Sequence, residues 1–135
     1  MAAYDDLIAF QRETEALSQV AGRLGWDQET MMPENAAPQR AEEHAAMANV
    51  LHARRIDPRV GDWLAKAEAV DDGATANLRH IQRSYDRTMK VPATLAAEIA
   101  KTTSLAHRVW AKSRSEEDVA SYLPVLEKVV ALRKE

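Results

Sequence analysis

Histidines are the first residues to consider for metal chemistry, because a neutral imidazole is a common ligand of catalytic zinc. A helical zinc site of the H-E-x-x-H type needs two histidines four residues apart and a glutamate directly after the first. The four histidines of this sequence are His44, His52, His80 and His107. No two of them are four apart, and none is followed by glutamate. The sequence therefore contains no zinc site of this type.

Other metal and nucleophile patterns are missing as well. A carboxylate-bridged di-iron site needs a glutamate three residues before a histidine, and those positions hold Ala41, Asn49, Asn77 and Ser104. Along one helix His44 and His52 would be roughly 12 Å apart, too far for one small ion. The glycines and serines form no phosphate-binding loop or nucleophile elbow. We therefore predict no catalytic residue and no metal ligand.

Two polar residues that directly follow the first predicted helix are candidates for contact with a substrate. Asp27 and Gln28 directly follow Trp26, and burial of this tryptophan would partly bury them too. Asp27 has a structural alternative, because an aspartate commonly ends a helix or accepts hydrogen bonds from the backbone of the next loop. We favour the structural role for Asp27 over substrate contact.

Four arginines form a second group of candidates. Arg79, Arg83 and Arg87 repeat every four residues on one helical face, and Arg40 precedes them in the chain. A guanidinium group matches the planar geometry of a carboxylate, so Arg40, Arg79 and Arg83 are weak candidates for binding a peptide carboxylate. The alternative is an ordinary solvated face, with Asp86 and nearby glutamates as partners.

Helical spacing of the apolar residues predicts the elements that carry these side chains. We expect six helices at about residues 4–26, 38–53, 58–70, 74–89, 92–113 and 122–135. Asp57 and Asp71 are expected to cap the third and fourth, and the second should pack closely through alanines. No stretch has the period-two pattern of a strand, so the predicted fold is an all-α bundle with short connections.

The last of these helices contains a proline, which constrains where it begins. Pro124 is tolerated only near the start of a helix, so a turn is expected up to Ser121 and the helix from about Tyr122. Its inward stripe is predicted at Leu123, Leu126 and Val130, with Arg133 as a fourth position.

A structural elbow is predicted at Gly25, Trp26 and Pro33. Gly25 accepts a close-packed or left-handed conformation, Trp26 offers the largest burial, and Pro33 ends the first helix. These three residues are expected to fix the angle between the first two helices.

Composition limits the remaining possibilities. The 135 residues fit one domain, residues 1–135, and 25 of them are alanine, which leaves a thin core. A net charge of −3 gives no basic field for nucleic acid. The absence of cysteine fits a reducing compartment, and no stretch is apolar enough to span a membrane. We expect a cytoplasmic protein that binds neither nucleic acid nor membrane.

Several motifs resemble one known family. They are Leu24-Gly25-Trp26-Asp27-Gln28-Glu29-Thr30, Met32-Pro33, Arg40-Ala41-Glu42, Ala76-Asn77-Leu78-Arg79, Tyr85, Val91-Pro92, Thr103-Ser104 with Trp110, and the closing Leu126-Glu127-Lys128-Val129-Val130-Ala131-Leu132-Arg133. They resemble the amino-terminal part of the carboxypeptidase Taq family of metal-dependent carboxypeptidases. The resemblance spans nearly the whole chain.

The resemblance implies an all-helical enzyme, often a homodimer, that removes single residues from peptide C-termini with zinc or a similar divalent ion. The metal ligands of that family match no position here, so the chain resembles an N-terminal helical domain. Such a domain would contribute a groove wall and dimer contacts, need a C-terminal catalytic portion as its partner, and be inactive alone. The alternative is a freestanding, non-catalytic helical module that binds a protein partner through its alanine-rich stripes.

Overall fold

The computed structural model describes residues 2–135, and within them it contains six α-helices and no strand. The helices are α1 (Ala2–Thr30), α2 (Ala37–Arg55), α3 (Pro58–Lys66), α4 (Asp72–Thr88), α5 (Ala93–Glu116) and α6 (Val119–Lys134), with a short 3₁₀ turn at Glu34–Ala36 before α2. The all-α fold predicted from the sequence is therefore confirmed. None of these helices combines the length and apolar character needed to cross a membrane.

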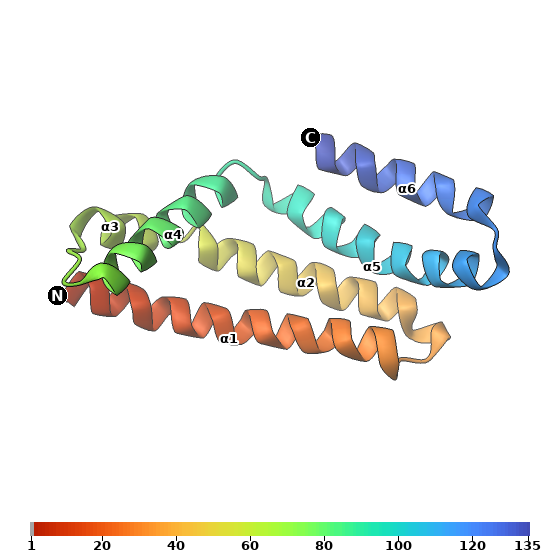
Figure 1. Ribbon diagram of the computed structural model, residues 1–135, viewed down its shortest axis with the longest axis horizontal. Helices are drawn as coiled ribbons and strands as arrows, with labels where there is room; N and C mark the ends of the chain where they lie inside the picture. Colours follow the sequence, from red (N-terminus) through yellow and green to blue (C-terminus); the bar gives the residue numbers. More distant parts are fainter. Residues whose placement is uncertain (1) are drawn as a thin grey trace.

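Four long helices form a flat layer in the order α1, α2, α5, α6 (Figure 1). Neighbours in this layer run in opposite directions, and α2 lies between α1 and α5. The short helix α3 and the helix α4 gather at the end of the layer where α1 begins. Most of the layer is one helix deep, so its helices cover one another only along their edges.

The apolar core lies at the end of the layer that α3 and α4 cover. Leu7 and Phe10 of α1 are buried there with Val60 of α3. Around them pack the partly buried side chains of Trp63, Leu64, Leu78, Ile81 and Tyr85. The Phe10 and Trp63 rings are tilted, with centroids 5.5 Å apart, a favourable aromatic geometry. This small cluster fixes α3 and α4 on the start of α1.

Small side chains form the contact between α2 and α5. Ala37 and Ala41 of α2 and Ala106 of α5 are buried, as are Thr102 and Ser104. Side chains of this size let two helices approach closely. The prediction that α2 would pack closely through alanines is confirmed.

Two predicted helix caps are present. The Asp57 carboxylate accepts a hydrogen bond from the Arg59 backbone N–H at 2.9 Å, and Pro58 occupies the first turn of α3. The Asp71 carboxylate likewise accepts from the Ala74 N–H at 2.7 Å. Each aspartate pairs an amide that has no partner inside its own helix, which is why both helices begin where the sequence indicates.

The expected elbow at Gly25 and Trp26 needs correction. Helix α1 continues through both residues to Thr30, and no glycine in the described chain has a positive φ. Glycine weakens a helix but does not end it, and the turn comes later, at the segment that contains Pro33. Trp26 is 64% exposed, because it lies about 200° around the helix from inward-facing Leu24.

The junction of α5 and α6 also differs from the prediction. Helix α5 ends at Glu116, and Glu117 has a left-handed conformation with φ of 54°. Asp118 then caps α6 by accepting from the Ser121 N–H at 3.3 Å. Helix α6 therefore begins at Val119, and Pro124 lies inside it. The lost amide leaves the carbonyl of exposed Ala120 without a helical partner, and water can replace that bond.

The inward face predicted for α6 is wrong. Leu123, Leu126 and Val130 are exposed, at 46, 39 and 42%. The partly buried face consists instead of Tyr122, Val125, Val129 and Leu132. Both stripes have helical spacing and both are apolar, so periodicity alone did not distinguish them.

Candidate functional site

Arg40 of α2 forms the centre of a polar cluster at the junction with α1. Its Nη2 atom donates to Asp27 Oδ2 at 2.6 Å, and its Nη1 atom donates to the Leu24 carbonyl at 2.5 Å. Its Nε atom donates to Glu43 Oε2 at 2.7 Å. The hydrogen bond with Asp27 raises the pKa of Arg40, against an opposing effect of burial. All three guanidinium nitrogens of this side chain, which is only 13% exposed, are occupied.

Gln28 makes a separate connection from α1 to α5. Its Nε2 atom donates to the Ser104 carbonyl oxygen at 3.0 Å, and the Ser104 hydroxyl donates to Gln28 Oε1 at 2.8 Å. Ser104 is buried. The side-chain amide of Gln28 is thus held by an internal partner on each of its two polar atoms.

These contacts decide how three of the predicted site residues are held. Asp27 was expected to end the helix or bind the backbone of residues 30–32 with its side chain. Its main-chain carbonyl accepts from the N–H groups of Met31 and Met32, at 2.9 Å each, while its carboxylate binds Arg40. Asp27, Gln28 and Arg40 join helices to one another, and contact of any of them with substrate remains a prediction.

The other two predicted site residues lie apart from this cluster. Arg79 and Arg83 are on the exposed surface of α4. Within residues 2–135 neither side chain forms an ion pair. Arg87, the third member of their repeat, lines a cavity that neither of them borders. The structure therefore does not bring Arg40, Arg79 and Arg83 together at one place.

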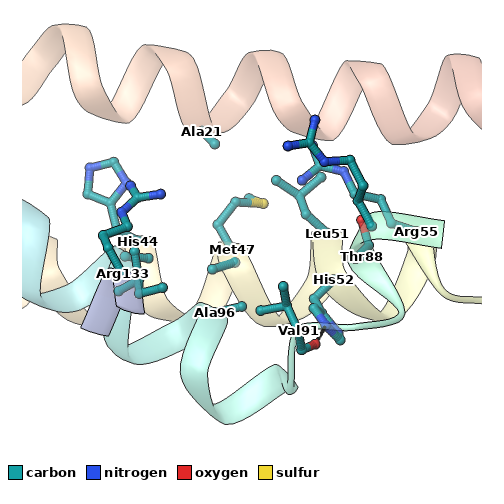
Figure 2. Close-up of a pocket in the computed structure, with 14 residues that line it drawn as sticks. Ala21, His44, Met47, Leu51, His52, Arg55, Thr88, Val91, Ala96 and Arg133 are labelled. Carbon is teal, nitrogen blue, oxygen red and sulfur yellow. Dashed lines mark hydrogen bonds between the residues drawn. The ribbon is translucent and has the colours of Figure 1, made fainter. Parts of the chain in front are cut away.

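A cavity of about 460 Å³ lies over α2, between α1 and the start of α5 (Figure 2). Its floor is apolar and includes Met47, Leu51 and Ile99. The ends of α4 and α6 contribute to its rim through Arg87, Thr88 and Arg133. We call it the arginine-lined cavity. Its size is typical of pockets that hold a small molecule or a peptide side chain.

Positive charge dominates the polar part of the arginine-lined cavity. Arg55, Arg87 and Arg133 come from three different helices, and His44 and His52 lie beside them. None of the fourteen lining residues carries a carboxylate. The cavity therefore matches a group that combines an apolar body with a negative charge.

The two histidines of this cavity differ in their surroundings. His52 is buried, and its Nε2 atom lies 2.6 Å from the Val91 carbonyl oxygen, which fixes the ring. Burial lowers the pKa of His44, and nearby Arg40 lowers it further. The lowered pKa favours the neutral form of His44, and Arg55, Arg87 and Arg133 are the permanent positive charges of the cavity.

The donor groups in the described part of the chain do not suit a metal ion. No three or more histidine, aspartate or glutamate side chains gather closely enough to hold one. His44 and His52 line the arginine-lined cavity, His44 and His107 line a second cavity, and His80 lies elsewhere. No reaction step can be assigned to a metal bound by these residues.

The described chain is a helical unit with a cationic cavity, and comparison with known proteins identifies its family. The family model of the carboxypeptidase Taq (M32) metallopeptidases matches residues 6–135. The chain belongs to this family, as the motifs around Trp26 indicated.

Two characterised relatives show how much of such a protein is present. The chain is 41% identical over 140 aligned residues to thermostable carboxypeptidase 1 of Thermus thermophilus. This match covers 99% of the chain but 28% of the relative. A protein of the same name from Pyrococcus furiosus is 26% identical, over 95% of the chain and 26% of that protein. The chain spans little more than a quarter of the relatives' length.

Several residues of the site were missed in the sequence. No local pattern predicted the roles of Ser104, Arg55 and Arg133, because Ser104 bonds to Gln28 of α1 and the two arginines meet in the cavity from separate helices. Arg54 was also missed, although its Nε atom donates to Thr14 Oγ1 at 2.9 Å. The available signal was the adjacent pair Arg54-Arg55 after the alanine-rich stripe of α2. An arginine beside small side chains can reach across to a neighbouring helix.

Proposed function

We propose that this chain is the N-terminal helical domain of a metal-dependent carboxypeptidase, an enzyme that releases C-terminal residues from peptides. The observation that carries the proposal is the family match over residues 6–135 in a chain that covers 28% of the Thermus thermophilus relative. The domain forms part of the substrate groove and takes part in dimer contacts. It is inactive without the C-terminal catalytic portion.

The divalent metal of this enzyme is bound outside the present chain in our proposal. The support is the lack of a suitable group of ligands among residues 2–135. The metal, zinc or a similar ion, polarises the peptide carbonyl and activates water when it is bound. The residues described here act on the substrate by position and charge.

The arginine-lined cavity is the part of the domain best suited to wall the groove. Arg55, Arg87 and Arg133 offer guanidinium groups with no carboxylate beside them in the cavity, over an apolar floor. A peptide end carries a carboxylate and often an apolar side chain, which these two features complement. Arg79 and Arg83 lie outside this cavity, so they are the weaker candidates.

The first test compares the chain alone with a chimaera. In the chimaera, this chain replaces the matched segment of thermostable carboxypeptidase 1 from Thermus thermophilus. We expect a blocked dipeptide to be cleaved by the chimaera with added zinc or cobalt, and the cleavage to stop with chelator. The 135-residue chain alone should show no cleavage. Chelator-sensitive cleavage by the chain alone would refute the proposal.

The second test addresses the groove wall. In the chimaera, Arg55→Gln and Arg133→Gln should raise KM for peptides by roughly tenfold, the loss of one charge-assisted hydrogen bond. Arg79→Gln and Arg83→Gln are matched controls, because they remove the same charge from outside the cavity. Equal KM values for all four variants would exclude the cavity from the groove.

The alternative function is a freestanding interaction module without catalysis. The observation that favours it is the exposure of two large aromatic side chains, Trp26 at 64% and Trp110 at 47%. A module of this kind forms a discrete homodimer or heterocomplex in sedimentation experiments. A monomer that gains stability only in the chimaera would exclude it.

A further inference from the structure

Helix α6 is apolar on two faces. Its partly buried face contacts α5 through Tyr122, Val125, Val129 and Leu132. A second row of apolar side chains lies in solvent, and we call it the outer stripe. It consists of Val119, Leu123, Leu126 and Val130, which are between 39 and 66% exposed.

The outer stripe has the spacing of a helical contact surface. Its residues are separated by four, three and four positions, so they fall on one side of the helix. At 100° per residue, the centre of the stripe lies about a third of a turn from the centre of the buried face. A helix that is apolar over so much of its circumference is normally enclosed by other elements.

No other helix in the described chain presents such a row. Helices α1 and α5 each expose two large apolar side chains, which are Val20 and Trp26 on α1 and Leu105 and Trp110 on α5. Scattered exposed apolar residues are normal on a protein surface. Four exposed apolar side chains in one row on a single helix are unusual. Such a row indicates a surface that another part of the protein or a partner covers.

We propose that the outer stripe is the surface on which the catalytic portion of the carboxypeptidase packs, with apolar side chains of that portion as the occupant. This inference rests on the proposed function. Its support is the length of the relatives, since more than two thirds of the Thermus thermophilus protein lies outside the matched segment. A covering segment joined to this chain pays little of the entropy that association costs.

A second copy of this chain is the competing occupant, and the size of the stripe disfavours it. A stable protein interface buries roughly 800 Å² on each partner. Four partly exposed aliphatic side chains on one helix supply only a fraction of that area. Between separate molecules the outer stripe is therefore too small, whereas within one polypeptide it is sufficient.

The test places charges on the outer stripe in two settings. Leu123→Glu and Leu126→Glu are introduced together into the isolated chain and into the chimaera described above. Ala131→Glu is the matched control, because Ala131 is exposed on the same helix about 100° from the stripe. Thermal unfolding is followed by circular dichroism, and sedimentation gives the oligomeric state.

We expect the double substitution to lower the Tm of the chimaera by about 5 °C, since two charges are then forced into an apolar contact. The same pair should change the Tm of the isolated chain by less than about 2 °C, because the stripe is in water there. Ala131→Glu should have little effect in both settings.

Three results would overturn the inference. Equal, small shifts in both settings would mean that the stripe stays in water. A dimer of the isolated chain that the double substitution converts to a monomer would assign the stripe to a second copy. An unsubstituted chimaera that does not fold would show that the catalytic portion does not pack on this chain. Loss of peptidase activity in a chimaera whose Tm still responds to the stripe would instead contradict the proposed function alone.

Discussion

Gln28 and Ser104 exchange two hydrogen bonds across 76 residues of sequence, one in each direction. They join α1 to α5 at a place where α2 otherwise separates the two helices (Figure 1). Both polar atoms of the Gln28 side chain are partly buried and hydrogen-bonded. Removing one side chain of the pair therefore leaves a polar group of the other without its hydrogen bond, which destabilises the fold.

This pair can be tested by a double-mutant cycle. Gln28→Ala and Ser104→Ala should each lower the free energy of unfolding by about 1 kcal/mol, and the double variant should lose clearly less than the sum. Urea unfolding of the four proteins measures the coupling. Additive losses would show that the two side chains do not stabilise the fold through each other.

Replacing Arg54 even with lysine should lower the stability of the protein. Its guanidinium carbon lies 4.0 Å from the centroid of the Phe10 ring, and its nitrogens donate to Thr14 Oγ1 and to the Phe10 carbonyl. A lysine keeps the charge but cannot make both hydrogen bonds while it covers the ring. We expect Arg54→Lys to lower the free energy of unfolding by about 1–2 kcal/mol.

The control for Arg54 is Arg23→Lys on the exposed surface of α1. It makes the same chemical change without a buried partner, so a change within about 0.5 kcal/mol is expected. A similar loss for both substitutions, in urea unfolding, would mean that the contacts of Arg54 contribute nothing specific.

The lowered pKa of Asp57 predicts that the free energy of unfolding decreases at acidic pH. Hydrogen bonds from the Arg59 side chain and backbone lower the pKa of Asp57 from its ordinary 3.8 to about 2. The unfolded chain therefore binds this proton more readily than the folded chain does. The contribution of Asp57 is present above pH 3.8 and is lost as the pH falls toward 2.

Two substitutions of Asp57 separate the cap from the charge. Asp57→Ala removes the cap and should cost about 1 kcal/mol at neutral pH. Asp57→Asn keeps an acceptor for the Arg59 N–H and should flatten the stability profile between pH 3.8 and 2. Thermal unfolding at several pH values measures both effects. A profile unchanged by Asp57→Asn would assign the acid sensitivity to other carboxylates.

Glu117 is the position at which a glycine should stabilise the protein. Its φ of 54° lies in the left-handed region, which costs a side chain more than it costs glycine. Glu117→Gly should raise the free energy of unfolding by about 0.5–1 kcal/mol. Glu117→Ala keeps the unfavourable Cβ atom and should not produce this gain. A gain of equal size for alanine would trace the effect to the lost charge.

Local chemistry explains what the sequence predicted well. Asp57 and Asp71 cap their helices through bonds within three residues, and Pro58 and Pro92 mark helix starts because of their own backbone geometry. The short turns follow from the same signals. Such features need no knowledge of the tertiary contacts, so the six helices could be predicted from the sequence.

Tertiary contacts decided the features that the sequence did not predict. Trp26 was expected to be buried because of its size, whereas the inward face of α1 is set by Leu7, Phe10 and Leu24. On α6, two apolar stripes competed and the position of α5 selected Tyr122 and Val125 over Leu123. Gln28 is held by Ser104 of α5, and Arg40 binds Asp27 and Leu24 of α1, so residue type alone gave the candidates without these contacts.

A single layer of helices cannot enclose a hydrophobic core without a second layer packed on it. Its buried apolar cluster, Leu7, Phe10 and Val60, lies at one end, and most of the layer lacks a second layer above it. If the catalytic portion supplies that layer, the two parts form one cooperative unit. The whole enzyme would then melt in a single calorimetric transition, with no earlier peak from these helices.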